Sequence, residues 1–130
     1  MIYSHVLLAE QFIIPLVKFR FSSTERNKFD YYDFIKKTSE QLNIENMKIV
    51  KADVFRFIEN CNEQFDFIFA GPPYALTTID DLPRLIFEKK LLNLKGWFVL
   101  EHTPRNDYKK FANYKTERNY GTTIFSIFIQ

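Results

Sequence analysis

The sequence predicts an α/β fold, a three-layer sandwich in which a mostly parallel sheet ends in an antiparallel C-terminal hairpin. Three observations support this prediction. Strand-like segments rich in apolar residues alternate with segments of helical periodicity. The apolar segment FDFIFA (65–70) is typical of a strand covered on both faces. The chain ends in two strand-like segments around Tyr120-Gly121, which is typical of a hairpin.

The composition indicates one globular domain over residues 1–130. Hydrophobic residues make up 46% of the chain and charged residues 26%, which excludes a disordered chain. No repeat, linker or low-complexity segment suggests a domain boundary. The net charge of +2 permits contact with nucleic acid without requiring it.

The sequence gives no sign of a metal site, a disulfide or a membrane anchor. Cys61 is the single cysteine, and His5 and His102 are too far apart in sequence to resemble a zinc site. The apolar segment 6–17 is interrupted by Glu10 and by Pro15, is too short to span a bilayer, and lacks the features of a signal peptide. We therefore expect a cytoplasmic protein.

The first half of the chain contains two predicted strands and one predicted helix. Residues 12–21 are rich in branched and aromatic side chains and predict a strand. Asp30 is a candidate N-cap for a helix over 31–42, whose apolar residues recur at helical spacing. Residues 47–53 predict a short strand that ends at Asp53.

The second half continues the alternation. One or two helical turns are predicted over 54–60, a strand over 65–70, a helix over 79–92, a strand over 94–102 and a hairpin over 114–130. Pro83 belongs near the start of its helix, where its missing N–H is tolerated.

Three polar or rigid features follow predicted strands, at the edge where parallel sheets bind ligands. They are Glu25, Asp53 and the sequence GPPY at residues 71–74. Their positions make a binding site plausible without identifying its ligand.

With GPPY placed directly after FDFIFA, the chain resembles the class I S-adenosylmethionine-dependent methyltransferases, which have a Rossmann-like fold. More narrowly, it resembles the RsmD type, which methylates N2 of a guanine in 16S ribosomal RNA. The resemblance extends over about residues 23–130 and rests on SSTERN, DFIKKTSEQLNIENMKIVKADVFRFI, FDFIFAGPPY, LPRLIFEKKLL, GWFVLEH and the final hairpin.

The resemblance implies that residues 71–74 form the catalytic elbow. In this family the elbow is Asp-Pro-Pro-Tyr or Asn-Pro-Pro-Tyr. A side-chain oxygen and the following prolyl carbonyl accept the hydrogens of the base amine, and the aromatic ring stacks on the base. Pro72, Pro73 and Tyr74 match this motif, whereas Gly71 stands where the acid or amide is expected. A glycine supplies no side-chain acceptor.

The resemblance also implies a site for S-adenosylmethionine. Glu25 would accept hydrogen bonds from the ribose hydroxyls, Asp53 would receive the adenine amine, and Val54 would lie beside the adenine ring. Residues 1–21 diverge from the family, because they contain no glycine where a glycine-rich turn is expected. We therefore expect weak binding of S-adenosylmethionine or none, and we interpret residues 1–21 as a truncated or frame-shifted start of a longer gene.

Several functions remain open at this point. The first is a methyltransferase acting on ribosomal RNA or on a small-subunit assembly intermediate. The second is a catalytically inactive remnant or nucleic-acid-binding module of the same fold, and the third is a DNA amino-methyltransferase. Basic residues that could contact RNA phosphates, or simply face solvent, are Lys36, Lys37, Lys89, Lys90, Arg105, Lys109, Lys110 and Arg118. His102 lies near the predicted strand end, where most histidines have no chemical role.

Overall fold

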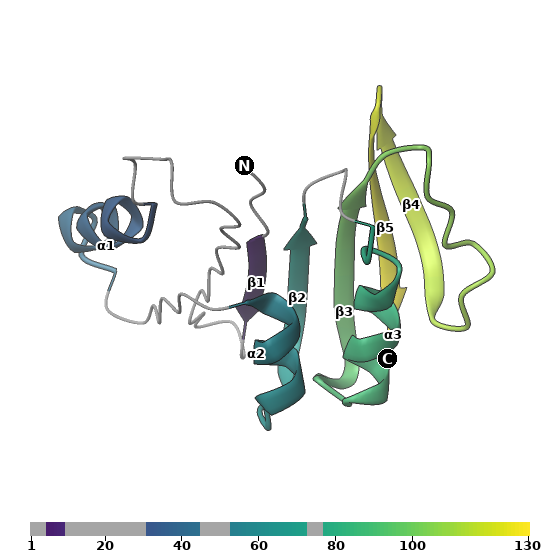
Figure 1. The fold of residues 1–130 in the computed structure, drawn as a ribbon, viewed down its shortest axis with the longest axis horizontal. Helices are drawn as coiled ribbons and strands as arrows, with labels where there is room; N and C mark the ends of the chain where they lie inside the picture. The colour runs from purple at the N-terminus through teal and green to yellow at the C-terminus, as the bar shows by residue number, and fades with distance from the viewer. Residues whose placement is uncertain (1–4, 10–30, 45–52, 73–76) are drawn as a thin grey trace.

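The computed structural model describes residues 5–9, 31–44, 53–72 and 77–130. Within these ranges the chain forms five strands and three helices (Figure 1). In chain order they are β1 (His5–Ala9), α1 (Tyr31–Gln41), α2 (Val54–Asn60), β2 (Phe65–Gly71), α3 (Asp81–Glu88), β3 (Leu92–His102), β4 (Tyr114–Tyr120) and β5 (Thr123–Ile129).

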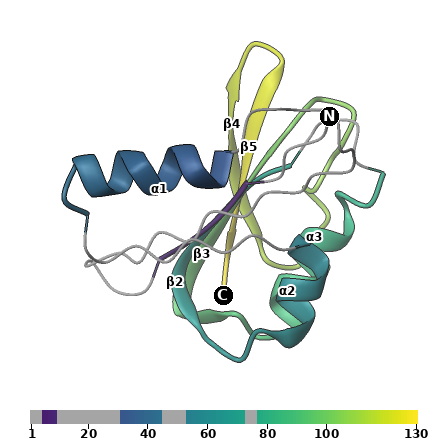
Figure 2. The same ribbon diagram turned by 60° about the vertical axis from the view of Figure 1, so that its left-hand side comes forward.

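The five strands form one mixed sheet in the order β1-β2-β3-β5-β4. β2 and β3 are parallel, whereas β1 with β2, β3 with β5 and β4 with β5 are antiparallel. Figure 2 shows α2 and α3 on one side of the sheet and α1 on the other. The predicted α/β class and the antiparallel C-terminal hairpin are confirmed. The sheet was predicted to be mostly parallel, but among the described residues it is mixed, with β2 and β3 as its one parallel pair.

The segment from β2 through α3 to β3 explains this parallel pair. Two parallel strands cannot be joined by a tight turn, so a helical crossover is required between them. α3 buries Leu82, Pro83 and Ile86 against the sheet. Pro83 is the third residue of the helix, where its backbone nitrogen has no intrahelical partner in any case. The expected place of this proline near the helix start is confirmed.

The other predicted elements agree with the structure where it describes them, except that the helix predicted over 79–92 ends at Glu88 and Leu92 already belongs to β3. α1 lies within the predicted helix 31–42, and α2 coincides with the helical turns predicted over 54–60. The predicted strand over 12–21 lies outside the described residues. The same holds for the predicted strand over 47–53, apart from Asp53.

The sheet buries one of its faces more completely than the other. Ile68, Phe98 and Leu100 are fully buried and belong to one core cluster with the buried side chains of α2 and α3. Phe67 and Phe69 point to the opposite face and are only partly buried. The expectation that 65–70 is covered on both faces therefore holds fully for one face only.

The main core is built around the ring of Phe128, which is fully buried on β5. The Phe98 ring stacks on it with a centroid distance of 5.3 Å. Further rings lie with their centroids 5.6–6.2 Å from that of Phe128, namely Phe87, Tyr108, Phe111 and Tyr114. These contacts join β3, β4, β5 and the segment between β3 and β4 into one packed unit.

The hairpin between β4 and β5 turns at Gly121 and Thr122, one residue beyond the predicted Tyr120-Gly121. Tyr120 pairs with Thr123, which leaves a two-residue loop. Gly121 has φ +67°, a conformation that two-residue hairpins need and that glycine adopts at low cost.

Replacing Phe128 with alanine should strongly destabilise the fold, because it removes the ring around which the other aromatic side chains pack. We expect the free energy of unfolding to fall by about 3–5 kcal/mol. Urea unfolding followed by circular dichroism measures this change. Leu94, whose side chain is 84% exposed, provides the control. A loss in Phe128→Ala no larger than that in Leu94→Ala would contradict this account of the core.

Candidate functional site

The carboxyl ends of β2 and β3 lie side by side because the two strands are parallel. Ala70 pairs with Leu100 in this register, so Gly71 and Glu101 are the next residues along each strand. Ala70 and Leu100 are fully buried on the helix-covered face. Since side chains alternate along a strand, position 71 and Glu101 face the opposite side of the sheet.

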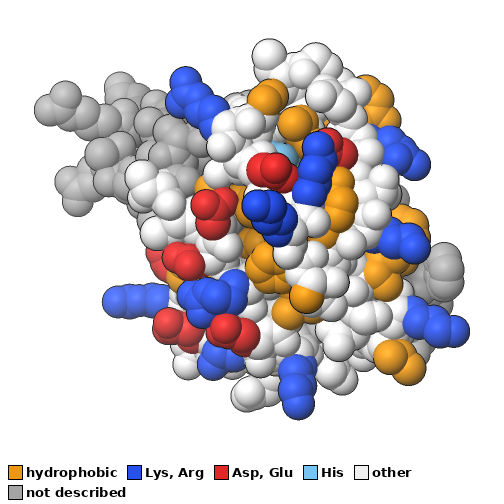
Figure 3. Space-filling view, turned by 90° about the vertical axis from the view of Figure 1, so that its right-hand side faces the viewer, with side chains coloured by type: hydrophobic (Ala, Val, Ile, Leu, Met, Phe, Trp, Pro, Cys, Tyr) orange, Lys and Arg blue, Asp and Glu red, His pale blue; other side chains and the backbone are white. Residues whose placement is uncertain are grey.

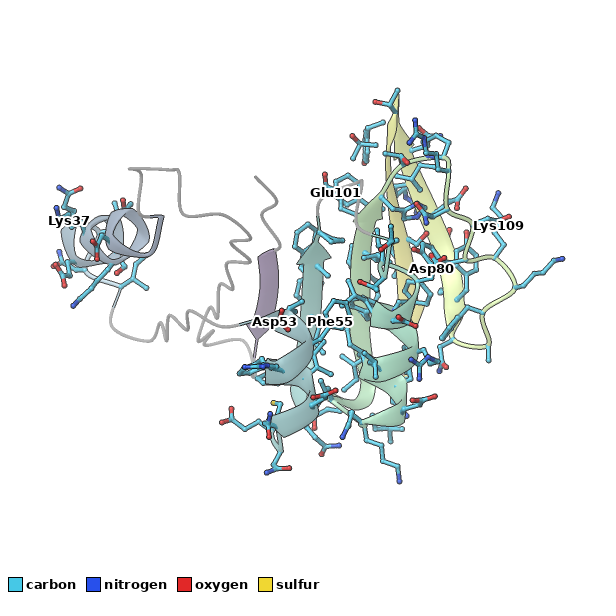
Figure 4. All side chains as sticks on the ribbon, in the orientation of Figure 1. Lys37, Asp53, Phe55, Asp80, Glu101 and Lys109 are labelled. Atoms are coloured by element: carbon cyan, nitrogen blue, oxygen red, sulfur yellow. The ribbon has the colours of Figure 1, made fainter. Side chains whose placement is uncertain are left out.

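The carboxylate of Glu101 lies directly beside Gly71. A Cβ atom at position 71 would be 3.3 Å from Glu101 Oε2 and 3.3 Å from Phe69 Cε1. Figure 4 shows Glu101 at the end of β3 that lies next to the end of β2. Pro72 follows Gly71 and is buried, so the start of the predicted elbow is anchored in the protein. The structure therefore brings together Gly71, Pro72 and a carboxylate that we did not single out from the sequence.

The sequence would show Glu101 beside Gly71 only if the register of the two parallel strands were known. FDFIFAG and GWFVLEH are both mainly apolar, and a register that places Ala70 beside Leu100 places Gly71 beside Glu101. The register itself is set by packing across the sheet, and single-strand patterns do not contain it.

Asp53 caps the N-terminus of α2. Its Oδ1 accepts a hydrogen bond of 3.1 Å from the backbone nitrogen of Arg56. The next residue, Val54, is 1% exposed and belongs to the hydrophobic core. Both residues thus have structural roles, and their expected contacts with the adenine group stay predictions.

The remaining predicted site residues lie outside the described residues. They are Pro73 and Tyr74 of the elbow and Glu25 of the expected ribose site. Their assigned roles stay predictions based on the family resemblance.

β1 runs antiparallel to β2, with His5 opposite Gly71 and Ala9 opposite Phe67. The carboxyl end of β1 therefore points away from the elbow. In the family, the first strand should instead deliver a glycine-rich turn to the edge where the elbow lies. The described residues consequently do not fit a complete S-adenosylmethionine site, although they contain the first part of the base-binding elbow.

His102 points into the core, on the face opposite Glu101. It is 1% exposed, and its Nδ1 lies 2.8 Å from the carbonyl oxygen of Thr103. A carbonyl only accepts, so Nδ1 donates to it, and Nε2 lies within hydrogen-bond distance of Ser126 Oγ, at 2.7 Å. The Tyr108 ring meets the imidazole edge-on, with centroids 4.8 Å apart. These contacts favour a structural role for His102.

The sequence of this chain matches a known protein family. Residues 22–129 match the family model described as conserved hypothetical protein 95. The chain belongs to this family. The match confirms the resemblance to the RsmD type, and it covers nearly the same residues as the motifs noted in the sequence.

Solved structures similar to this member of the family share its fold. A proposed methyltransferase of Escherichia coli, yhhF, superposes with a TM-score of 0.71 at 13% identity, over 88% of this chain and 61% of that one. A conserved hypothetical protein of Streptococcus pyogenes superposes with a TM-score of 0.67 at 22% identity, over 75% of this chain and 64% of that one. A proposed methylase of Haemophilus influenzae superposes with a TM-score of 0.70 at 16% identity, over 87% of this chain and 70% of that one.

The chain thus spans less than two thirds of the length of the first two of these proteins. At these identities the likeness concerns the fold. No curated protein matches the sequence significantly.

On the face that Figure 3 shows, several basic side chains of this family member lie beside acidic ones. Lys109 Nζ lies 3.3 Å from Glu117 Oε1, and Arg84 contacts both Asp81 and Glu88. This arrangement favours solvated faces over a continuous phosphate-binding surface.

The described residues contain neither a membrane-spanning helix nor a candidate metal site. None of the described helices has both the length and the apolar character needed to cross a membrane. In the same residues, His, Cys, Asp and Glu side chains form no group of three that could hold a metal ion.

The capping role of Asp53 can be tested by two substitutions. Asp53→Ala removes the side-chain acceptor and should lower the free energy of unfolding by about 1 kcal/mol. Asp53→Asn retains a capping oxygen and should be close to the wild type in urea unfolding. Equal stability of Asp53→Ala and the wild type would contradict the capping role.

The Tyr108–Asp80 contact should make the fold less stable at alkaline pH. Burial, and then the 2.7 Å hydrogen bond from the Tyr108 hydroxyl to Asp80 Oδ1, raise the pKa of Tyr108 above its usual range. The unfolded chain should therefore release this proton first, and the free energy of unfolding should fall as pH rises above about 10. Urea unfolding across this range should show a smaller fall in Tyr108→Phe than in the wild type. Equal falls would contradict the assignment.

Proposed function

We propose that this chain is an RsmD-type methyltransferase whose substrate is N2 of a guanine in 16S ribosomal RNA. The proposed donor is S-adenosylmethionine, and the RNA is free or part of a small-subunit assembly intermediate. Membership of the family supports the reaction class. The proposed methylase and methyltransferase among the similar structures agree with it.

The observation that carries this proposal is the position of the Gly71-Pro72 segment. It lies at the carboxyl end of a strand in the parallel pair, beside the end of β3. Ligands in α/β folds bind at this edge of the sheet. Pro72 has no N–H and a restricted φ, which limits the backbone conformations available at this point.

The remaining roles come from the family resemblance. Pro73 would continue the rigid turn and Tyr74 would stack on the base. Glu25, Asp53 and Val54 would contact the ribose and adenine of the donor. When bound, S-adenosylmethionine supplies a methyl group activated by a sulfonium.

A second candidate function is a nucleic-acid-binding module without catalysis. Two observations favour it. The antiparallel direction of β1 leaves the described residues without the turn that should hold the donor. Gly71 also lacks the side-chain acceptor of the family motif, and loss of one preorganised polar group at a reacting centre typically lowers the rate by about 10²–10³.

Titration with S-adenosylmethionine separates the two candidates. We expect weak but saturable binding below millimolar cofactor, measured by equilibrium dialysis, because the glycine-rich turn is missing but the other expected contacts remain. With 16S RNA and labelled donor, label should appear in N2-methylguanosine after nucleoside chromatography. Absence of both signals at millimolar donor would contradict the proposed methyltransferase and leave the binding module.

A further inference from the structure

We propose that Glu101 supplies the acceptor that position 71 lacks, so that its carboxylate binds the exocyclic amine of the target nucleobase. This inference rests on the proposed function, because it assigns a residue to the same base-binding elbow. It adds a specificity-determining residue that comes from a neighbouring strand.

The position of the carboxylate supports this assignment. Glu101 Oε2 would lie 3.3 Å from a Cβ atom at position 71, which places this oxygen in the space that an Asp or Asn side chain would enter. The two residues are neighbours across the parallel pair and face the same side of the sheet. A carboxylate that starts from β3 can therefore reach the place of one that would start from β2.

Glycine at position 71 makes this arrangement possible. A side chain there would contact both Glu101 Oε2 and the Phe69 ring at a distance tighter than most real Cβ contacts. An Asp would also bring two like charges together, which disfavours ionisation of both. The absence of an acid at position 71 is thus compatible with Glu101 beside it, whereas a second acid there would be crowded and would favour protonation of one of the two.

The chemistry of the carboxylate suits an amine donor. An ionised carboxylate only accepts hydrogen bonds, and an exocyclic amine presents two N–H groups. Glu101 would accept one of them, and the family resemblance implies that the prolyl carbonyl after position 71 would accept the other. Such a pair of acceptors would discriminate guanine, which has a 2-amino group, from inosine, which lacks it.

Binding of two short single-stranded RNAs tests the proposal without requiring catalysis. The strands share one sequence, and a single guanine in the first is replaced by inosine in the second. We expect the wild type to bind the guanine strand about tenfold more tightly, because the lost hydrogen bond involves a charged acceptor. Fluorescence anisotropy at fixed salt measures both affinities.

Three variants make the test specific to Glu101. Glu101→Ala should reduce the guanine preference to nearly onefold. Glu63→Ala removes the same charge in the exposed segment before β2, at the opposite end of that strand, and should keep the preference. The double variant Gly71→Asp with Glu101→Ala should restore it, because the acid returns to the family position without a second carboxylate. Circular dichroism confirms that each variant is folded.

The outcomes separate this inference from the proposed function. A guanine preference that survives in Glu101→Ala overturns the role of Glu101 and leaves the methyltransferase proposal intact. Binding of both RNAs by the wild type without preference overturns recognition of the amine by Glu101 as well. Failure of the wild type to bind either RNA overturns the proposed RNA substrate, and with it this inference.

Discussion

The parallel pairing of β2 with β3 determines where the candidate site lies. It aligns the carboxyl ends of the two strands, and it therefore places Gly71, Pro72 and Glu101 at one edge of the sheet. The crossover through α3 makes this pairing possible, and the burial of Ile68, Phe98 and Leu100 fixes its register. A shift of one residue along either strand would turn the apolar side chains outward and separate Glu101 from Gly71.

The last two residues of β3, Glu101 and His102, point to opposite faces of the sheet. Glu101 faces the side of the elbow, whereas His102 faces the core and is held by Thr103 and Ser126. Tyr108 packs edge-on against His102 and donates to Asp80, which precedes α3. The buried polar groups thus stabilise the segment that follows β3, whereas the carboxylate of Glu101 lies beside Gly71 on the other face.

Much of the described fold could be predicted from the sequence, because local patterns determine it. The helical spacing of α1, α2 and α3, the apolar segments of β2 and β3, and the glycine of the last hairpin all agree with the structure. The direction of β1 could not be predicted, because an edge strand of this length can pair in either direction and its neighbour decides. The elbow was visible as Pro-Pro after an apolar strand. Glu101 was not, because its importance arises only when two strands distant in sequence are placed in register.

A disulfide between positions 71 and 101 would show that these two residues are neighbours in the sheet. Neighbouring strands lie about 4.8 Å apart, within the Cα separations that disulfides bridge. In a Cys61→Ser background, Gly71→Cys with Glu101→Cys should lose its free thiols under mild oxidation, measured by thiol titration and mass spectrometry. Gly71→Cys with His102→Cys, on opposite faces, should keep them. Free thiols in the first pair, or rapid bonding in the second, would contradict the arrangement of the site.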